Sequence, residues 1–474
     1  MHREILKHPL LLKKYSNTLI YDYTEYPTKG VWDESYGSEE YKADFNQFTS
    51  TTDNPVMLYI HTPFCEELCY FCLCSKSITK EYEKVEKYLY NDLFKEIELY
   101  EKLMEGTGKT VRVGEVYFGG GSPTYYKEQD FEKLVSRLKN VFDFSSVKNF
   151  TVETDPRRVD TDKLSFYSEQ GVNRLSFGVQ DFDESVQKEI NRIQPSELFD
   201  KLLTNDIRQK FKTINFDILV GLTRQTPETM RKTIQEVVRI RPTEVQPLYF
   251  HYKPNTRHYM TRMTRNVTLP DFYDRKALYA EVIDGLLAGG YERAGYENFA
   301  LPSDVLATAT KKGDAYYNSL GTTSGEVKNF ISLGSSAHGV FDAQVYMQNY
   351  YELDKYHDAL AKGEFPIYRG LRISREDQMR HQIIKHFRIY DSLDTASFGE
   401  KWNIKFCDHF SKELDVLEEF VKDGLIEISS SELNMTPMGR EFTRRICEVF
   451  DGYAKRELFD RKMQKVIELV PQVS

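Results

Sequence analysis

The fold of this chain is decided by residues 59–74, which read YIHTPFCEELCYFCLC. Four of the six cysteines lie in this stretch, and Cys65, Cys69 and Cys72 have C-x3-C-x2-C spacing on a loop after a predicted strand. Soft thiolates are the ligands that iron–sulfur clusters require, and a tight loop can present three of them together. We therefore predict an iron–sulfur cluster at this loop. Three protein ligands for a four-iron cluster would leave one iron free to bind a further ligand.

These cysteines could instead form a structural zinc site or a disulfide framework, or their spacing could be chance. Structural zinc normally takes four ligands in two separated pairs, and the chain has no second C-x2-C pair. Cys74 could complete a set of four, but its C-x-C spacing from Cys72 is cramped for that geometry. Disulfide bonds are disfavoured because nothing in the sequence indicates secretion. A redox cluster is therefore the favoured interpretation.

The composition is typical of a globular enzyme. With 474 residues the chain is long enough for two or three domains, and it is 40% hydrophobic and 14% aromatic. Its 32 Tyr and 30 Phe would suit a pocket for a large flat ligand, although most of them are better assigned to ordinary core and surface positions. The net charge of −9 gives no basic bias toward nucleic acid or an anionic membrane. With no signal-peptide pattern and no apolar run near the roughly 20 residues of a membrane span, we expect a soluble, anaerobic-type enzyme of the reducing cytoplasm.

Residues 56–300 alternate short β-branched or aromatic runs with longer amphipathic runs. The predicted strands are Met57–His61, Glu115–Gly119, Asn149–Glu153, Arg174–Gly178, Thr213–Val220 and Glu244–Tyr249. The predicted helices include Tyr82–Met104, Gln129–Val141, Thr161–Glu169, Pro227–Ile240 and Asp271–Ala288. Repeated β–α units without a Rossmann fingerprint favour an α/β fold, a partial (β/α)6 TIM-like barrel, in which the chemistry lies at the C-terminal ends of the strands.

Polar residues and glycines follow these strands at their C-terminal ends, where a barrel has its active site. The second strand leads into residues 119–124, GGGSPT, whose glycines let the backbone approach a ligand closely. The third ends at Glu153, a carboxylate that can accept hydrogen bonds from an ammonium group or a ribose. The fourth carries Gln180, with Arg192 beyond it, and the fifth delivers Asp217. Each alone would carry little weight, but their recurrence at successive strand ends indicates one ligand site.

The run at 59–74 resembles the signature of the radical S-adenosylmethionine (radical SAM) enzymes. More narrowly, it resembles that of the oxygen-independent coproporphyrinogen III oxidase (dehydrogenase) family, whose motif adds an aromatic residue before the third cysteine and a fourth cysteine, here Phe71 and Cys74. Residues 23–28, YTEYPT, resemble the stretch that precedes the barrel in that family and folds over the active site. The resemblance covers residues 21–453, nearly the whole chain.

This resemblance implies a [4Fe-4S] cluster and S-adenosylmethionine (SAM), in one or two copies, as cofactors. The implied cluster ligands are Cys65, Cys69 and Cys72. The implied SAM-binding residues are Tyr59, Phe71, Gly120, Gly121, Ser122, Glu153, Gln180, Arg192, Asp217 and His338. Tyr59 is also the candidate catalytic residue, because the family uses the matching tyrosine near SAM, although an aromatic that only fills the barrel would fit the pattern too. His61 fits a packing role equally well and is assigned no catalytic role.

Four segments are expected along the chain. Residues 1–55 would form an N-terminal extension over the active site, 56–300 the barrel, 301–365 a bridging region and 366–474 a C-terminal helical cap with a winged-helix-like shape. The elements predicted in this cap are helices at Arg375–Arg388 and Cys407–Lys422, a β-hairpin over 425–436, a helix from Pro437 through Phe450 and an amphipathic helix at Ala454–Val470. Such a shape also allows a DNA-binding interpretation, but the segment contains many acidic residues, so nucleic acid is not expected.

One stretch departs from the family pattern. Members of the family typically carry N-F-Q-G-Y-T-T in the bridge, whereas residues 318–324 here read NSLGTTS, so Ser319 and Leu320 replace an aromatic residue and an amide. We expect oxidative decarboxylation of coproporphyrinogen III propionates to vinyl groups, giving protoporphyrinogen IX in haem biosynthesis. The alternatives are a related two-SAM enzyme, either a methyltransferase or a haem ring-opening enzyme, and a haem-binding chaperone on the same barrel. The implied partners are a tetrapyrrole substrate and a flavodoxin or ferredoxin-type electron donor, with the chain as a monomer.

Overall fold

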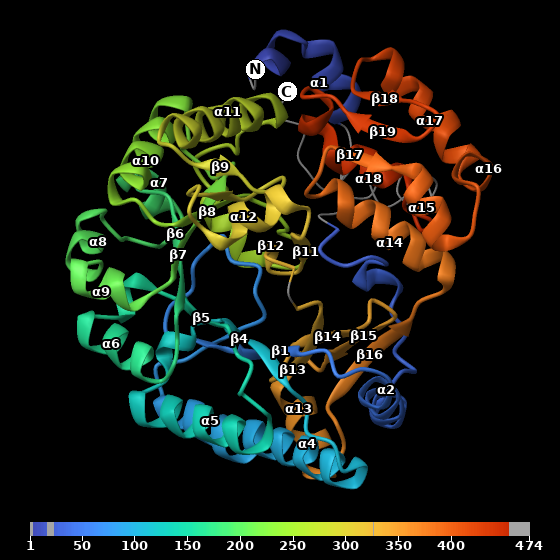
Figure 1. Cartoon of the computed structure of the whole chain (residues 1–474). Helices are drawn as coiled ribbons and strands as arrows, with labels where there is room; N and C mark the ends of the chain where they lie inside the picture. The colour runs from blue at the N-terminus through green and yellow to red at the C-terminus, as the bar shows by residue number, and fades with distance from the viewer. Residues whose placement is uncertain (1–2, 17–22, 326, 455–474) are drawn as a thin grey trace.

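The computed structural model describes residues 3–16, 23–325 and 327–454, and it contains one large sheet wrapped by helices with a second domain beside it (Figure 1). The sheet has 12 strands in the order β16-β15-β14-β13-β1-β4-β5-β6-β7-β8-β10-β9. These strands are β1 (Val56–Thr62), β4 (Val113–Gly120), β5 (Asn149–Thr154), β6 (Arg174–Gln180), β7 (Thr213–Val220), β8 (Glu244–Tyr249), β9 (Glu292–Arg293), β10 (Phe299–Ala300), β13 (Asn329–Leu333), β14 (His338–Phe341), β15 (Val345–Asn349) and β16 (Ile367–Arg372).

All the predicted barrel strands are confirmed, as β1, β4, β5, β6, β7 and β8, and each pairs in parallel with the next. They are buried on both faces, as nearly continuous apolar strands in a parallel sheet must be. The sequence did not predict β13, which adds a further parallel strand beside β1, with Met57 opposite Phe330. Antiparallel strands then extend both ends of the sheet. The predicted fold class, an open α/β barrel with a C-terminal domain, is confirmed.

Amphipathic helices cover the outside of the barrel (Figure 1). They are α3 (Tyr82–Tyr88), α4 (Phe94–Thr107), α5 (Glu128–Val141), α6 (Thr161–Glu169), α7 (Glu184–Glu189), α8 (Glu197–Leu202), α9 (Asn205–Lys210), α10 (Pro227–Ile240) and α11 (Phe272–Ala288). Helix α12 (Val305–Lys312) instead lies over the middle of the barrel in Figure 1. The predicted helix over 82–104 is interrupted by a π-helical turn at Leu89–Leu93, and the other predicted barrel helices are confirmed as α5, α6, α10 and α11. Helix α10 begins with a capping box at Thr226 and a proline in its first turn, which satisfy and pre-organise its N-terminus.

The N-terminal extension packs against two different parts of the molecule. Helix α1 (Pro9–Ser16), together with the buried Tyr23 and Tyr26, contributes to the hydrophobic core of the C-terminal domain. Helix α2 (Ser38–Thr51), which the aperiodic sequence did not predict, lies beside β15 and β16 (Figure 1). There the ring of Phe48 stacks on Phe341 with centroids 4.6 Å apart. Aromatic packing therefore fixes the extension to both ends of the fold.

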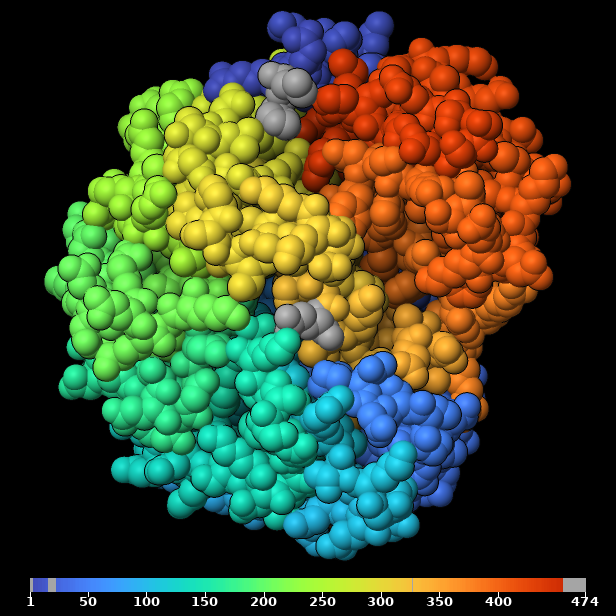
Figure 2. Space-filling model, viewed as in Figure 1, coloured from blue at the N-terminus to red at the C-terminus, as the bar shows by residue number. Residues whose placement is uncertain are grey.

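The C-terminal domain packs against the barrel along a seam (Figure 2) and has a hydrophobic core of its own. Its elements are α14 (Arg375–Phe387), β17 (Ser392–Asp394), α15 (Thr395–Trp402), α16 (Phe406–His409), α17 (Ser411–Lys422), β18 (Ile426–Ile428), β19 (Glu432–Met435), the 3-10 helix η7 (Gly439–Phe442) and α18 (Thr443–Val449); α13 (Leu353–Ala361) precedes it. The predicted helices and hairpin are confirmed, except that the second helix breaks after His409 and the last one starts as η7. The predicted helix at 454–470 lies almost wholly outside the described residues. None of the helices that the structure describes has the length and apolar character of a membrane span.

Candidate active site

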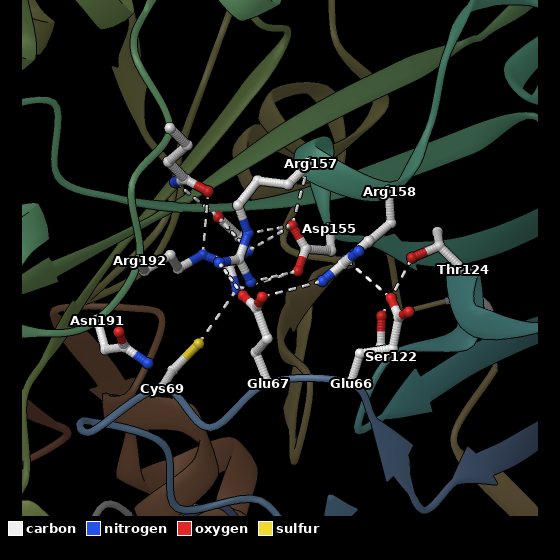
Figure 3. A network of polar contacts seen from close by, with 12 residues as sticks. Glu66, Glu67, Cys69, Ser122, Thr124, Asp155, Arg157, Arg158, Asn191 and Arg192 are labelled. Atoms are coloured by element: carbon white, nitrogen blue, oxygen red, sulfur yellow. Dashed lines mark hydrogen bonds and ion pairs between the residues drawn. The ribbon is translucent and has the colours of Figure 1, made fainter. Parts of the chain in front are cut away.

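The cysteine loop leaves the C-terminal end of β1 and is fastened there by charged residues (Figure 3). Strand β2 (Phe64–Cys65), which contains the first cysteine, pairs in parallel with β3 (Ser77–Ile78) beyond the last cysteine and so closes the loop. Within it, Glu66 pairs with Arg158 of the loop after β5 at 2.9 Å. Its neighbour Glu67 lies 3.3 Å from the Arg157 guanidinium of the same loop. These ion pairs hold the cysteines against the ends of the barrel strands.

A cavity with a volume of about 480 Å³ lies beside this loop, at the C-terminal ends of the strands. The predicted site residues that line it are Cys65, Cys69, Cys72, Phe71, Gly120, Gly121, Ser122, Glu153, Gln180, Arg192 and Asp217. Residues far from these in the sequence also line it, namely Thr24 of the extension, Tyr317, Ser319 and Leu320 of the bridge, and Arg444 of α18. The barrel, the extension and the C-terminal domain thus all contribute to one cavity.

The glycine loop approaches the cysteine loop too closely for any side chain. The amide of Gly121 donates to the carbonyl of Thr62 at 2.7 Å. A Cβ atom on Gly121 would lie 2.7 Å from the carbonyl oxygen of Phe64. Gly120 has a φ of +107°, in a region that L-residues rarely adopt. The glycines are therefore required where the two loops meet.

Two partly buried carboxylates, Glu153 and Asp217, line the cavity. The Glu153 carboxylate accepts hydrogen bonds from the Gly120 amide and the Tyr117 hydroxyl, both at 3.1 Å. Burial raises the pKa of Glu153 to about 8, and the negative charge of Asp217 adds to this shift. Burial also raises the pKa of Asp217 to about 6, although a hydrogen bond of 2.7 Å from Asn215 Nδ2 acts to lower it. Because a cationic ligand would stabilise both charged forms, this wall suits an ammonium or sulfonium group.

A third carboxylate binds arginines instead (Figure 3). Asp155 accepts from Arg157 Nη2 at 2.7 Å and lies 3.5 Å from the Arg192 guanidinium. Burial would raise the pKa of Asp155, but the charges of Arg192 and Arg157 lower it to about 2. Arg192 also donates to the Gly178 carbonyl at 2.8 Å, and its Nη1 lies 3.6 Å from the sulfur of Cys69. Arg192 thus brings a fixed positive charge to the cysteine loop.

Two predicted residues, Tyr59 and His338, do not line the cavity. The Tyr59 ring stacks on Tyr117, which does, with centroids 5.9 Å apart, and its hydroxyl lies 3.1 Å from His61 Nδ1. His338 Nε2 lies 2.7 Å from the Glu25 carboxylate of the extension. The structure therefore brings the cysteines and the strand-end residues together in one cavity, with Tyr59 packed against the lining residue Tyr117 and His338 paired with the extension.

The donor chemistry of the cysteine loop fits a [4Fe-4S] cluster with SAM beside it. Cys65, Cys69 and Cys72 are free thiols that line the same cavity. Across the described residues no three His, Cys, Asp or Glu side chains converge closely enough to hold a single metal ion. A cluster instead takes one thiolate at each of several irons. The neighbouring glycines leave space for a ligand backbone, and the acidic wall matches the positive charge of SAM.

Sequence reasoning missed two groups of site residues. The acids of the cysteine loop, Glu66 and Glu67, stand in the quoted motif, but their arginine partners lie about 90 residues away. On the opposite side of the cavity, Glu297 and Arg444 meet only because the C-terminal domain packs on the barrel. In the sequence, Arg444 is one of three arginines in residues 440–445, and nothing local distinguishes it from the other two. No local signal identifies such long-range partners.

Comparison with known proteins establishes the class. Residues 59–237 match the radical SAM superfamily, and residues 373–442 match the HemN C-terminal domain. The solved structure of HemN from Escherichia coli, described as a coproporphyrinogen III oxidase and radical SAM enzyme, matches with a TM-score of 0.84 and 31% sequence identity, over 94% of this chain and 98% of that chain. The chain is therefore a radical SAM enzyme, an oxidoreductase whose cofactors are a [4Fe-4S] cluster and SAM.

Relatives of known activity establish the family. The oxygen-independent coproporphyrinogen III oxidase of E. coli K12 is 31% identical over 445 residues, which cover 94% of this chain and 95% of that one. The enzyme of the same name from Helicobacter pylori strain 26695 is 32% identical over 435 residues, covering 91% and 94%. The chain belongs to the oxygen-independent coproporphyrinogen III oxidase family.

Proposed function

We propose that this enzyme converts coproporphyrinogen III to protoporphyrinogen IX, a step of haem biosynthesis, by oxidative decarboxylation of two propionate side chains to vinyl groups. One observation supports this most directly. The loop cysteines, the glycine loop and the acidic strand ends line a single cavity. The chain that forms this cavity is similar, over 94% of its length, to the oxygen-independent coproporphyrinogen III oxidase of E. coli.

The cluster and SAM, when bound, supply a one-electron cleavage of SAM to methionine and a hydrogen-abstracting 5′-deoxyadenosyl radical. Each propionate would then lose a hydrogen atom to that radical, carbon dioxide to the solvent and one electron to an external one-electron acceptor, which leaves a vinyl group. We propose a flavodoxin or ferredoxin-type protein as the electron donor for SAM cleavage, and the reducing cytoplasm as the compartment.

The residues of this chain would bind and orient these groups. Glu153 and Asp217 would accept hydrogen bonds from SAM donors and offset its positive charge, because both carboxylates line the cavity. Gly120 and Gly121 would admit its methionine portion. Tyr59 would support the SAM site through its ring, which stacks on Tyr117 at the cavity wall.

A second candidate function rests on one observation in the cavity. Ser319 and Leu320, which replace the aromatic residue and the amide of the family pattern, both line it. They lie at the turn between β11 (Tyr316–Asn318) and β12 (Gly321–Thr323). The residues that would face the substrate thus differ from the family pattern, whereas those that would bind the cofactors match it. This combination favours a related two-SAM enzyme acting on tetrapyrroles, a methyltransferase or a haem ring-opening enzyme.

The test is an anaerobic assay of the enzyme with its cluster reconstituted. SAM, a reductant and coproporphyrinogen III are added, and the products are analysed by mass spectrometry. We expect loss of two carboxyl groups with formation of 5′-deoxyadenosine. Cys69→Ser should abolish both, whereas Cys407→Ser, at an exposed cysteine of α16, should leave both unchanged.

The remaining outcomes separate the alternatives. Deoxyadenosine without decarboxylation would refute the proposed reaction and favour the second candidate. An intact cluster that never cleaves SAM, in a protein that binds haem, would indicate a chaperone.

A further inference from the structure

The stretch between β8 and α11 carries positive charge and no negative charge. No Asp or Glu occurs between Glu244 and Asp271. Four cationic side chains lie in this stretch, namely Lys253, Arg257, Arg262 and Arg265, and we call residues 253–265 the basic segment. Since the whole chain has a net charge of −9, this run of like charges does not follow from composition.

The basic segment packs on the cysteine loop. Its buried side chains Met260 and Met263 belong to a small hydrophobic core, against which Tyr70, Phe71 and Leu73 of the cysteine loop are packed. Burial of these apolar groups holds the segment against the loop that carries the expected cluster ligands.

Hydrogen bonds join the two segments beside the cysteines. The Tyr259 hydroxyl donates to the backbone carbonyl of Cys72, one of the expected cluster ligands. Arg257 Nη2 donates to the next carbonyl, that of Leu73, at 3.3 Å. A protein bound on the basic segment would therefore lie next to the residues that would hold the cluster.

The four cations have no carboxylate partner among the described residues. Lys253, Arg262 and Arg265 are exposed, and Arg257 is partly buried. The Arg262 guanidinium lies over the Tyr70 ring of the cysteine loop, 5.2 Å from its centre. Because exposed and unpaired charges act on the surrounding solvent, the basic segment forms a positively charged surface.

Acids on the neighbouring elements are already engaged elsewhere. The glutamates of the cysteine loop and of α7 each pair with another cation, in the pairs Glu66–Arg158, Glu67–Arg157, Glu184–Lys188 and Glu189–Arg224. The aspartates Asp183, Asp271 and Asp274 cap the N-termini of α7 and α11, where they offset the helix dipole. These acids therefore do not cancel the charge of the basic segment.

The positively charged surface is separate from the cavity. Residues 253–265, all of them described, contribute nothing to the cavity lining, whereas Cys72 and Leu73 of the loop beneath them do. An electron can pass through a thin protein wall, whereas SAM and a tetrapyrrole need the open space of the cavity. A donor on the basic segment would thus approach the cluster without competing with either ligand.

We infer that the basic segment docks an acidic protein that donates one electron to the cluster. The inference rests on the proposed function, which needs an external donor for SAM cleavage, and it adds where that donor binds and which charge it carries. One electron leaves the reduced donor and enters the oxidised cluster, so no atom is transferred. Opposite charges steer the two proteins together and still let them separate, which suits a transient electron-transfer encounter.

The rate of cluster reduction tests this inference without turnover. The probe is a reduced flavodoxin with an acidic isoelectric point, mixed anaerobically by stopped flow with the cluster-reconstituted enzyme in the absence of SAM and substrate. The second-order rate constant is read from the bleaching of the cluster absorbance. The double variant Lys253→Gln with Arg265→Gln should lower this constant roughly tenfold at low salt, because two steering charges are lost. The Kd of the oxidised flavodoxin, measured by calorimetry, should rise by a similar factor.

Controls isolate the effect of charge at this surface. Photoreduced deazariboflavin, a small uncharged reductant, should reduce the double variant and the wild type at equal rates. Lys253→Arg with Arg265→Lys keeps both charges and should retain the wild-type constant with flavodoxin. Lys362→Gln with Lys412→Gln, at exposed lysines next to α13 and in α17, changes the net charge equally and should retain it too. Added salt should narrow the gap between the first double variant and the wild type, because salt screens exposed charges.

The outcomes distinguish this inference from the proposed reaction. A wild-type rate constant in Lys253→Gln with Arg265→Gln would overturn the inference, as would an equal loss with deazariboflavin, which would indicate a damaged cluster site. Unchanged reduction combined with lost binding to anionic lipid vesicles would assign the basic segment to a membrane surface and overturn it as well. The reaction fails separately, if the enzyme reduced by deazariboflavin cleaves SAM but does not decarboxylate coproporphyrinogen III.

Discussion

Replacement of Gly121 by alanine tests whether the contact between the glycine loop and the cysteine loop sets the geometry of the cavity. The added methyl group would lie 2.7 Å from the Phe64 carbonyl oxygen, 2.8 Å from the Thr62 carbonyl oxygen and 3.0 Å from the Phe64 nitrogen. Ordinary contacts begin at 3.4 Å, so the loops must separate by 3.4 − 2.7 = 0.7 Å. All three neighbours are backbone atoms, which cannot move aside by changing a rotamer.

The expected magnitude follows from this overlap. Forcing a methylene-sized group into a packed site costs about 1–3 kcal/mol. Gly121 is not among the glycines with positive φ, so the effect comes from contact alone. Because the strain acts between two loops that both line the cavity, we expect it to lower the free energy of unfolding by that amount and to raise the Kd for SAM by about tenfold.

Urea unfolding of the apo-protein and calorimetric titration of SAM into the cluster-reconstituted enzyme would measure these two effects. Gly106→Ala, near the end of α4, is the matched control, because nothing lies within 4 Å of its added Cβ and alanine favours a helix by up to about 1 kcal/mol. If Gly121→Ala unfolds and binds SAM like the wild type, close backbone contact is not what requires glycine here.

Three further predictions concern other parts of the fold. Burial raises the pKa of Glu153 to about 8, so this carboxyl holds a proton below that pH and cationic SAM must displace it. The affinity for SAM should therefore rise from pH 6 toward about 8, and SAM binding should release a proton. Calorimetry in buffers of different ionisation enthalpy measures this proton release. A Glu153→Gln variant with the same pH dependence as the wild type would contradict the prediction. The buried Glu96 carboxylate accepts three hydrogen bonds. Glu96→Ala should therefore lower the free energy of unfolding, measured in urea, by more than about 3 kcal/mol. The control Glu98→Ala, at an exposed position of the same helix, should lower it by less than about 0.5 kcal/mol. Phe341→Ala should cost about 3–5 kcal/mol and release α2 to proteolysis, whereas Leu10→Ala, 81% exposed, should do neither; equal cleavage of both would refute the docking of α2 on that ring.

The sequence was enough to predict the barrel because its signals are local. Each strand is a short apolar run, and the residue that follows it, such as Glu153, must lie at the same end of the parallel sheet as its counterparts. The cysteine loop could be placed for the same reason, since it follows β1 directly. Such patterns depend only on periodicity and strand direction.

The remaining features depend on contacts between distant segments, and the sequence contains no pattern for them. Strand β13 joins the sheet beside β1 by pairing Asn329 with Val56, although most of the barrel lies between these two residues in the sequence. Helix α2 is stabilised by aromatic rings such as Phe341 more than by an amphipathic repeat. Tyr59 stacks on Tyr117 of the neighbouring strand and His338 pairs with Glu25 of the extension, and no local sequence pattern predicts either contact.

The cavity wall beside the cysteine loop and the wall opposite it are therefore built from different kinds of segment. This difference affects which substrate the cavity accepts. The cofactor wall is assembled from residues at successive strand ends, whereas the opposite wall combines Thr24, Ser319, Leu320 and Arg444 from the extension, the bridge and the C-terminal domain. Substitutions in the second wall can change which tetrapyrrole is bound without disturbing SAM cleavage. In this chain the departure from the family pattern lies in that second wall, at residues 319–320. The chemical identity of the product, and not the formation of 5′-deoxyadenosine, is therefore the observation that decides between the two candidate reactions.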